Sequence, residues 1–295
     1  MDSQTRGIVV GYDGSPASEV AMDWAAAAAK HRGMRLTVLH TVDVVVAGVG
    51  PVYTVDRLPP EVADASDATL ESGVERAAKV LEVSHIHGMK AVGSPAGELV
   101  RASESADMVV TGSRGRGRLA AGLLGSVSYA VAAHSVCPAV VVRGTQAAHP
   151  DPSHQVIVGV DGSEASERAV DLAGELAAAS GAPLHIVSVG HLGSAESWAW
   201  FETSAAGTEH THALTAEAEE TGTRAGERMR AAHPGLAVES EVLFGDAGRV
   251  ISDLGARAGL IVLGTRGRGG FAGLLLGSVS HRVIHEADCA VMVVR

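Results

Sequence analysis

The fold class is decided by residues 7–29, GIVVGYDGSPASEVAMDWAAAAA. A short apolar, β-branched run at Ile8–Gly11 is followed by Asp-Gly-Ser and then by an alanine-rich stretch. The apolar run predicts a buried strand. Ser15 and Pro16 predict the N-cap and the first residue of a helix that ends near Gly33. A strand followed directly by such a helix is typical of the start of an α/β domain.

The same pattern occurs a second time at residues 156–179, VIVGVDGSEASERAVDLAGELAAA. Each copy has Asp-Gly-Ser directly after its apolar run, beginning at Asp13 and at Asp161. A second shared stretch, TGSRGRGRLAAGLLGSVS from Thr111, matches LGTRGRGGFAGLLLGSVS from Leu263. Two separate motifs repeated in the same order indicate a duplicated domain.

We therefore predict one domain at residues 1–146 and a second at residues 154–295, with the segment Gly144–His154 as the linker. Short apolar runs alternate with longer helical stretches in each copy. The strands expected in the first copy are Ile8–Gly11, Leu36–Val42, Ile86–Val92, Met108–Thr111 and Ala139–Val142. Its later helices are expected at about Ala63–Val83, at Pro95–Ser105 and from Ser126. The strands expected in the second copy lie near Val156–Gly159, Leu184–Val189, Val238–Phe244, Leu260–Leu263 and Ala290–Val294.

This alternation predicts an α/β fold with two tandem doubly wound domains, each a five-stranded parallel sheet flanked by helices. Ligands of such sheets bind at the carboxyl ends of the strands, where the strand order reverses. The Asp-Gly-Ser turn follows the first strand, and the glycine-rich stretch follows the fourth. If these two strands are neighbours, both loops face the same crevice.

The composition excludes several classes of protein. Of 295 residues, 46% are hydrophobic but only 3% are aromatic, so the core must consist of Val, Leu, Ile and Ala. The net charge is −11 without any basic block, which argues against binding to nucleic acid or to an anionic membrane. No apolar run reaches the ~18 residues of a membrane span, and no signal-peptide pattern is visible. We therefore expect a cytoplasmic protein.

The chain has two cysteines, Cys137 and Cys289, at equivalent places just before the fifth strand of each copy. Two thiols do not make a disulfide framework. Buried packing is the default for a free cysteine, and a redox-sensing thiol is the alternative.

A glycine-rich pattern, Gly-x2-Gly-x9-Gly-Ser, spans Gly112–Ser126 and again Gly264–Ser278. Glycines let a backbone approach a polyphosphate closely, and their bare N–H groups can form an anion-binding nest. The helix that follows presents free N–H groups and a favourable dipole to negative charge. Positive charge nearby comes from Arg114, Arg116, Arg266 and Arg268.

The motif leaves an alternative open. It lacks the lysine of a P-loop and does not fit the dinucleotide-binding fingerprint. A loop that merely turns tightly, with Ser126 as a plain N-cap, would show the same glycines. Similarly, Asp13 can bond its own backbone in a turn, or it can accept hydrogen bonds from ribose hydroxyls or an adenine amine.

The glycine pattern after the fourth strand, together with Asp at the end of the first, resembles the ATP-binding signature of universal stress proteins. The resemblance covers nearly the whole chain in two copies. It implies an adenine nucleotide alpha hydrolase-like sheet of order 3-2-1-4-5, with ATP in the crevice and Mg²⁺ or Mn²⁺ on its phosphates. It also implies that domains pair through their fifth strands, within one chain or between the chains of a homodimer.

The resemblance carries over to single residues. Asp13 and Asp161 match the family aspartate that contacts adenosine, and Val42 and Val189 are candidates for the adenine wall. Ser128 and Ser280 match a second hydroxyl near the phosphates. The phosphate loop of the first copy corresponds to Gly112, Arg114, Gly115, Gly125, Ser126, Val127 and Ser128. That of the second copy corresponds to Gly264, Arg266, Gly267, Gly277, Ser278, Val279 and Ser280. We assign no catalytic residue and no protein ligand for the metal.

These observations predict an ATP-binding regulator of a stress response whose protein partners are unknown. One alternative is a slow ATPase, since some relatives hydrolyse ATP weakly, although no general base and no Walker-B-like acid accompany the motif. Another alternative is a protein-interaction scaffold in which the nucleotide motif is vestigial.

Overall fold

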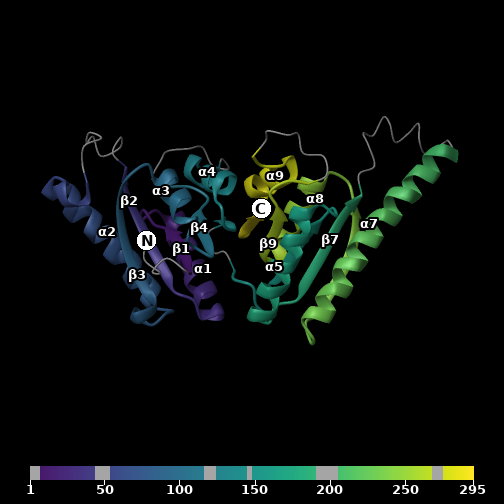
Figure 1. The fold of residues 1–295 in the computed structure, drawn as a ribbon, viewed down its shortest axis with the longest axis horizontal. Helices are drawn as coiled ribbons and strands as arrows, with labels where there is room; N and C mark the ends of the chain where they lie inside the picture. The colour runs from purple at the N-terminus through teal and green to yellow at the C-terminus, as the bar shows by residue number, and fades with distance from the viewer. Residues whose placement is uncertain (1–6, 44–53, 116–123, 145–147, 191–204, 268–274) are drawn as a thin grey trace. The chain divides into compact units, whose positions relative to one another are not determined.

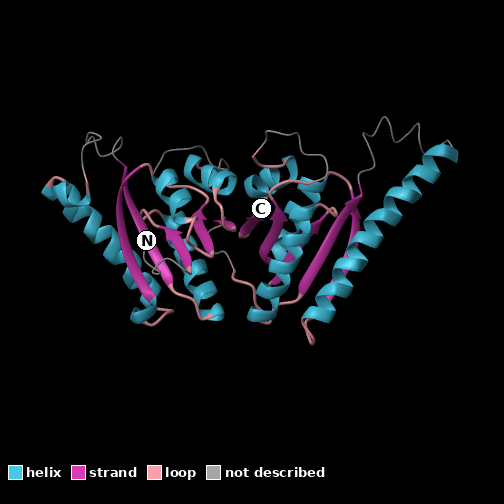
Figure 2. Ribbon diagram, viewed as in Figure 1, coloured by secondary structure: helices cyan, strands magenta, loops and turns pink. Residues whose placement is uncertain are grey.

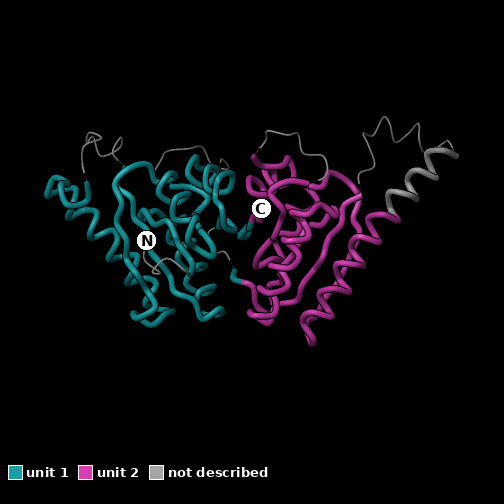
Figure 3. The backbone as a smooth tube through the Cα atoms, viewed as in Figure 1, with its two compact units in different colours: residues 1–149, 289–292 teal, residues 150–288, 293–295 magenta. Residues whose placement is uncertain are grey.

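The computed structural model describes residues 7–43, 54–115, 124–144, 148–190, 205–267 and 275–295 (Figure 1). The chain divides into two compact units, which Figure 3 shows in different colours. The first unit comprises residues 1–149 with 289–292, and the second comprises residues 150–288 with 293–295. No helix in the described segments is both long enough and apolar enough to cross a bilayer.

Strands and helices alternate along the first unit. Its strands are β1 (Ile8–Gly11), β2 (Leu36–Asp43), β3 (Ile86–Gly93), β4 (Met108–Gly112) and β5 (Ala139–Val142). Its helices are α1 (Pro16–Arg32), α2 (Pro60–Ala78), α3 (Pro95–Ala102) and α4 (Ser126–His134), with short 3₁₀ turns η2 (Val55–Arg57) and η3 (Val83–His85).

The second unit follows the same plan. Its strands are β6 (Gln155–Val160), β7 (Leu184–Gly190), β8 (Val238–Phe244), β9 (Ala258–Gly264) and β10 (Val291–Val294). The first two residues of β10 are grouped with the first unit. Its helices are α5 (Glu164–Ser180), α7 (Ala205–Ala232), α8 (Ala247–Asp253) and α9 (Ser278–Glu286), with the 3₁₀ turn η4 (Leu254–Arg257).

The strand order confirms the predicted fold class. It is β3-β2-β1-β4-β5 in the first unit and β8-β7-β6-β9-β10 in the second. Strand β1 pairs in parallel with both β2 and β4, and β6 pairs in parallel with both β7 and β9. The order therefore reverses between the first and fourth strands of each unit, and their carboxyl-end loops open at the same edge.

The helices lie along the strands in Figure 2. The positions of Gly11, at the end of β1, and of Tyr12 directly after it show which helices cover which face. A Cβ at Gly11 would lie 2.9 Å from Leu99 of α3, whereas the ring of the next residue, Tyr12, packs on Gly73 of α2. Successive residues of a strand point to opposite faces. Since α1 contacts α2 and α3 contacts α4, each pair of helices covers one face of the sheet.

The predicted start of the first helix is confirmed. The Ser15 hydroxyl accepts a hydrogen bond from the Ser18 N–H, and Pro16 is the first helical residue. The helix ends at Gly33, which has φ 60° and ψ 31° and donates its N–H to the last helical carbonyls. A left-handed residue at this position is the usual helix terminator, and glycine adopts it without steric penalty.

The second helix was predicted less well. It begins at Pro60 rather than near Ala63 and ends at Ala78 rather than near Val83. The chain after Ala78 turns through η3 instead, with the His85 N–H bonded to the Glu82 carbonyl. The third helix ends at Ala102, three residues before the predicted Ser105. Apolar periodicity continues past these ends, so it does not mark where the helical hydrogen bonds stop.

The two cysteines are free thiols, and Cys289 is buried while Cys137 is partly buried. Burial raises the pKa of the Cys137 thiol to about 11, because the charged thiolate is disfavoured away from water. The thiol therefore stays protonated at neutral pH, which agrees with the packing role and not with a reactive redox sensor.

A buried histidine lies near the amino end of the second sheet. His185 on β7 has its Nε2 3.1 Å from Glu241 Oε2 and its Nδ1 3.3 Å from an Arg257 nitrogen. Burial and the positive charge of Arg257 lower the pKa of His185, and Glu241 and Glu239 oppose the shift. The ring is therefore neutral at pH 7, with Arg257 donating to Nδ1 and Nε2 carrying the proton beside Glu241.

The contact of α2 with the sheet predicts a loss of stability from one added methyl group. A Cβ at Gly73 would lie 2.7 Å from the Tyr12 ring and 3.1 Å from Val38. We expect Gly73→Ala to lower the free energy of unfolding by about 1–3 kcal/mol through overpacking. Gly97→Ala in α3 is the control, because its Cβ would lie 3.7 Å from Ser94, and without a clash it should raise the free energy of unfolding by about 0.4–1 kcal/mol. Equal urea midpoints for the two variants would contradict this packing.

The state of His185 predicts how stability depends on pH. Because the pKa of His185 is lowered in the folded state, the residue contributes fully to the free energy of unfolding at pH values above its pKa in the unfolded chain, about 6.5. That contribution is lost as the pH falls further, since the unfolded chain takes up the proton first. We expect His185→Gln to flatten the fall in the free energy of unfolding between pH 7.5 and 5. Parallel stability curves for the two proteins would show that the ring is not held neutral.

Candidate functional site

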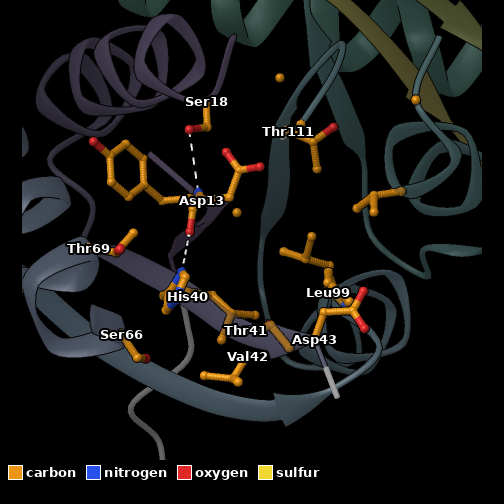
Figure 4. A pocket seen from close by; sticks show the side chains of 18 of the residues that line it. Asp13, Ser18, His40, Thr41, Val42, Asp43, Ser66, Thr69, Leu99 and Thr111 are labelled. Atoms are coloured by element: carbon orange, nitrogen blue, oxygen red, sulfur yellow. Dashed lines mark hydrogen bonds between the residues drawn. The ribbon is translucent and has the colours of Figure 1, made fainter. Parts of the chain in front are cut away.

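The carboxyl ends of β1, β2 and β4 open onto a cavity of about 710 Å³ in the first unit (Figure 4). The pairing of β1 with β4 brings the Asp-Gly-Ser turn and the glycine-rich loop to this cavity. Every site residue predicted in the first copy lines it. These are Asp13, Val42, Gly112, Arg114, Gly115, Gly125, Ser126, Val127 and Ser128.

Close backbone approach explains the glycines of the loop. A Cβ at Gly112 would lie 2.6 Å from the carbonyl carbon of Ala17 in α1, and a Cβ at Gly115 would lie 2.7 Å from Asp13 Oδ2. Gly125 donates its N–H to the Ser113 carbonyl at 2.8 Å and stands at the N-cap of α4. At these three positions the loop carries no side chain of its own, so its backbone forms a cradle that is open to close approach by an anion with many oxygens.

The first turn of α4 presents two serines with different roles. Ser126 is exposed at the mouth of the cavity. Ser128 is buried, and its hydroxyl donates to the Gly112 carbonyl at 2.6 Å. A hydroxyl has one proton, so Ser128 can accept but not donate toward a ligand in this arrangement. The predicted second phosphate hydroxyl therefore ties the end of β4 to the start of α4.

Asp13 has both of the roles that the sequence left open. Its Oδ1 accepts the Ser15 N–H at 3.0 Å, which is the interaction of a plain turn. Its Oδ2 is the atom that a Cβ at Gly115 would meet first. The same carboxylate therefore holds the turn and faces the glycine cradle, where a ligand hydroxyl or amine can donate to it.

The end of β2 forms the far wall of the cavity. Val42 is 6% exposed, and the next residue on the same face, His40, holds its Nδ1 2.8 Å from the Tyr12 carbonyl. A carbonyl only accepts, so Nδ1 carries the proton in this bond. The imidazole thus fixes the backbone directly before Asp13.

Several lining residues were not predicted from the sequence. The cavity is also lined by Tyr12, His40, Thr41, Ser66, Thr69, Leu99 and Thr111. The lining residues at the ends of the strands could have been predicted from the sequence, because side chains alternate between the two faces of a strand and these residues are next to the predicted loops. Those of α2 and α3 depend on how each helix is rotated against the sheet, which no local pattern gives.

The arginines contribute charge at the rim. Arg114 lines the cavity but is exposed, as is its counterpart Arg266 in the second unit. Arg116 and Arg268 lie outside the described residues. In the described segments, no group of three or more His, Cys, Asp or Glu side chains is arranged to hold a metal ion.

The second unit repeats the cradle. A Cβ at Gly267 would collide with Asp161 Oδ2, whose partner oxygen accepts the Ser163 N–H at 3.0 Å. The Ser280 hydroxyl donates to the Gly264 carbonyl at 2.7 Å, as Ser128 does in the first unit. The remaining predicted residues follow the same plan, with Gly277 at the N-cap of α9 and Ser278 and Val279 in its first turn.

The adenine-wall candidates are not equivalent in the two units. The registers pair Gly11 with Leu39 in one unit and Gly159 with Val187 in the other. Val189 therefore corresponds to Thr41, and the counterpart of Val42 is Gly190. The Phe244 ring lies 2.8 Å from where a Cβ of Gly190 would stand, and Phe244 is 44% exposed.

A protein-family model and several known proteins match this sequence over nearly its whole length. The model of the Universal stress protein family matches residues 5–143 and 152–295. A universal stress protein of Mycobacterium tuberculosis is 34% identical over 294 residues, covering 98% of this chain and 97% of that protein. One of Mycolicibacterium smegmatis is 35% identical over 302 residues, with 98% and 97% covered.

The fold is shared with a solved structure as well. The crystal structure of a universal stress protein from Archaeoglobus fulgidus has a TM-score of 0.67 and 20% identity, covering 99% of this chain and 98% of that chain. The family model matches both halves of the sequence, and the actinobacterial relatives match it almost from end to end. The chain belongs to the universal stress protein family.

Proposed function

We propose that this chain is an ATP-binding regulator of a stress response, with one nucleotide site in each of the domains 1–146 and 154–295. The observation that carries the proposal is the meeting of Asp13 with the glycine cradle at the mouth of α4, inside a cavity of about 710 Å³. Specific small-molecule pockets typically enclose about 300–1,000 Å³. The size and the chemistry of the cavity both suit a nucleotide.

Each part of a nucleotide finds a suitable partner in this site. The bare N–H groups of the cradle and the first turn of α4 suit the phosphates. The Asp13 carboxylate suits donors such as ribose hydroxyls or the adenine amine. The partly apolar walls suit a base. A bound Mg²⁺ or Mn²⁺ would be held mainly by the phosphates, with Ser126 as the exposed hydroxyl nearest in sequence to the cradle.

Regulation follows from differential binding. A nucleotide that orders the loops around the cradle favours one state of the carboxyl-end surface over another, with a coupling typically of about 1–3 kcal/mol. Protein partners that contact this surface would then sense nucleotide occupancy. We expect ATP turnover to be slow at most, far below the ~1–100 s⁻¹ of kinases.

The direct test is native mass spectrometry of protein purified without added nucleotide, followed by titration with ATP and Mg²⁺. Binding of one adenine nucleotide per domain supports the proposal. Absence of binding at millimolar ATP would refute it and favour the interaction scaffold.

Gly115→Val should abolish binding in the first unit and leave the second site intact. Even its Cβ would lie only 2.7 Å from Asp13 Oδ2, so the valine side chain would push Asp13 and the loop apart. Gly267→Val is the matched variant for the second unit, where the added side chain meets Asp161. Each variant should lose one bound nucleotide per chain in native mass spectra. Full stoichiometry in both variants would show that the cradle does not hold the phosphates.

Asp161 can be tested so that its two roles separate. Asp161→Asn keeps an oxygen for the Ser163 N–H but removes the negative charge, whereas Asp161→Ala removes both. A hydrogen bond to a charged group contributes about 1.5–3 kcal/mol, so both variants should weaken ATP binding at the second site by roughly tenfold or more. Only Asp161→Ala should also lower the thermal midpoint. Calorimetric titration in the Gly115→Val chain isolates this site, and unaltered affinity would leave Asp161 as a turn residue alone.

A further inference from the structure

Two hydroxyl groups of the cavity wall lack a hydrogen-bond partner anywhere in the described chain. Thr111 at the end of β4 and Ser66 on α2 both line the cavity, as Figure 4 shows, and each is only 3% exposed. Their oxygen atoms are buried and unpartnered. Most buried hydroxyls in folded proteins are satisfied, so an unpartnered pair in one cavity requires an explanation.

The side chains of these two residues line the cavity from opposite faces of the sheet, with their hydroxyl oxygens buried in its wall. Gly112 faces Ala17 of α1, so its neighbour Thr111 lies on the face that α3 and α4 cover. Ser66 belongs to α2, which covers the other face. A ligand seated across the carboxyl ends of β1 and β4 therefore has a hydroxyl-bearing side chain on either side.

In the second unit, Thr111 is replaced by an apolar side chain. The Ser128 and Ser280 hydroxyls donate to Gly112 and to Gly264, which fixes these glycines as equivalent. The residue before Gly264 is Leu263, which is 4% exposed. Its side chain lies 2.6 Å from where a Cβ of Gly159 would stand, so it fills the space beside β6.

The counterpart of Ser66 in the second unit also lacks a hydroxyl group. Arg76 of α2 pairs with Asp23 of α1, and Arg228 of α7 pairs with Asp171 of α5. These ion pairs fix Arg76 and Arg228 as equivalent positions. Ten residues earlier on the two helices stand Ser66 and Ala218.

We propose that Thr111 and Ser66 make the first site selective for the polar groups of the nucleotide base, whereas Leu263 and Ala218 leave the second site permissive. This inference rests on the proposed nucleotide binding. A pocket that hydrogen-bonds a ligand group rejects the analogue that lacks it, because its own buried groups are then left unpaired. An apolar pocket discriminates only weakly between the same two ligands. The duplicated chain thus combines a selective site with a permissive one.

The test uses full-length chains that each keep one site. Gly267→Val isolates the first site and Gly115→Val isolates the second. Affinities are measured for ATP and for purine riboside triphosphate, which lacks the exocyclic amine. We expect a larger ratio of ATP to analogue affinity at the first site. Thr111→Val should weaken ATP by about tenfold there, the size of one hydrogen bond, and affect the analogue less.

Stability of the ligand-free protein provides a readout that a merely structural hydroxyl would not give. Replacing an unsatisfied buried hydroxyl by a methyl group removes a desolvation penalty. Thr111→Val should therefore raise the thermal midpoint without nucleotide while it weakens ATP binding. A lower midpoint would show that the Thr111 hydroxyl has a structural partner and would overturn the proposal.

Reciprocal variants complete the design. In the Gly115→Val chain, Leu263→Thr should increase the preference for ATP over the analogue. In the Gly267→Val chain, Ser66→Ala tests the second hydroxyl independently of the folding of any Thr111 variant. Equal ATP-to-analogue ratios at both sites, unchanged by these substitutions, would refute the selectivity while leaving nucleotide binding intact. If neither single-site chain binds ATP, the proposed function itself fails.

Discussion

The parallel pairing of β1 with β4 is the constraint on which the site depends. Ile8, Val9 and Val10 lie in register with Met108, Val109 and Val110, and all six are buried. Because both strands are parallel and adjacent, the turn after β1 and the loop after β4 leave the sheet at the same edge. The contact between Asp13 and the backbone at Gly115 is possible only with this pairing. Apolar burial in the sheet thus positions the polar groups above it.

Much of this arrangement could be predicted from the sequence, because its signals are local. The β-branched run at Ile8–Gly11 and the Ser15–Pro16 pair fixed the first strand and the start of its helix. The glycine spacing identified the loop, since only backbone without side chains allows so close an approach. The duplication supported both assignments, because each motif occurs twice at the same place in a domain.

The rest of the site could not be predicted, for a physical reason. Ser66 and Leu99 reach the cavity through the rotation and tilt of α2 and α3, which are set by contacts with the sheet. The close contact of Gly73 with Tyr12 is one such determinant, and it joins residues far apart in the chain. The bond from Ser128 to Gly112 was missed similarly, because a serine in a first helical turn looks equally suited to a ligand.

The two units share the backbone cradle of the site but differ in the side chains of its walls. The backbone cradle and its serine–carbonyl bond are the same in both. A side chain added at Gly115 or at its counterpart Gly267 would meet an aspartate, and one added at the other glycines of the cradle would meet the neighbouring backbone. The walls are not the same. At the ends of the second and third strands, the first unit pairs Val42 with Val92 where the second pairs Gly190 with Phe244. The loss of one side chain makes room for a larger one, so the wall changes its shape and chemistry while the sheet stays packed. After duplication, substitutions in the cavity wall can therefore change which ligand a site prefers without altering the backbone cradle proposed to bind the phosphates.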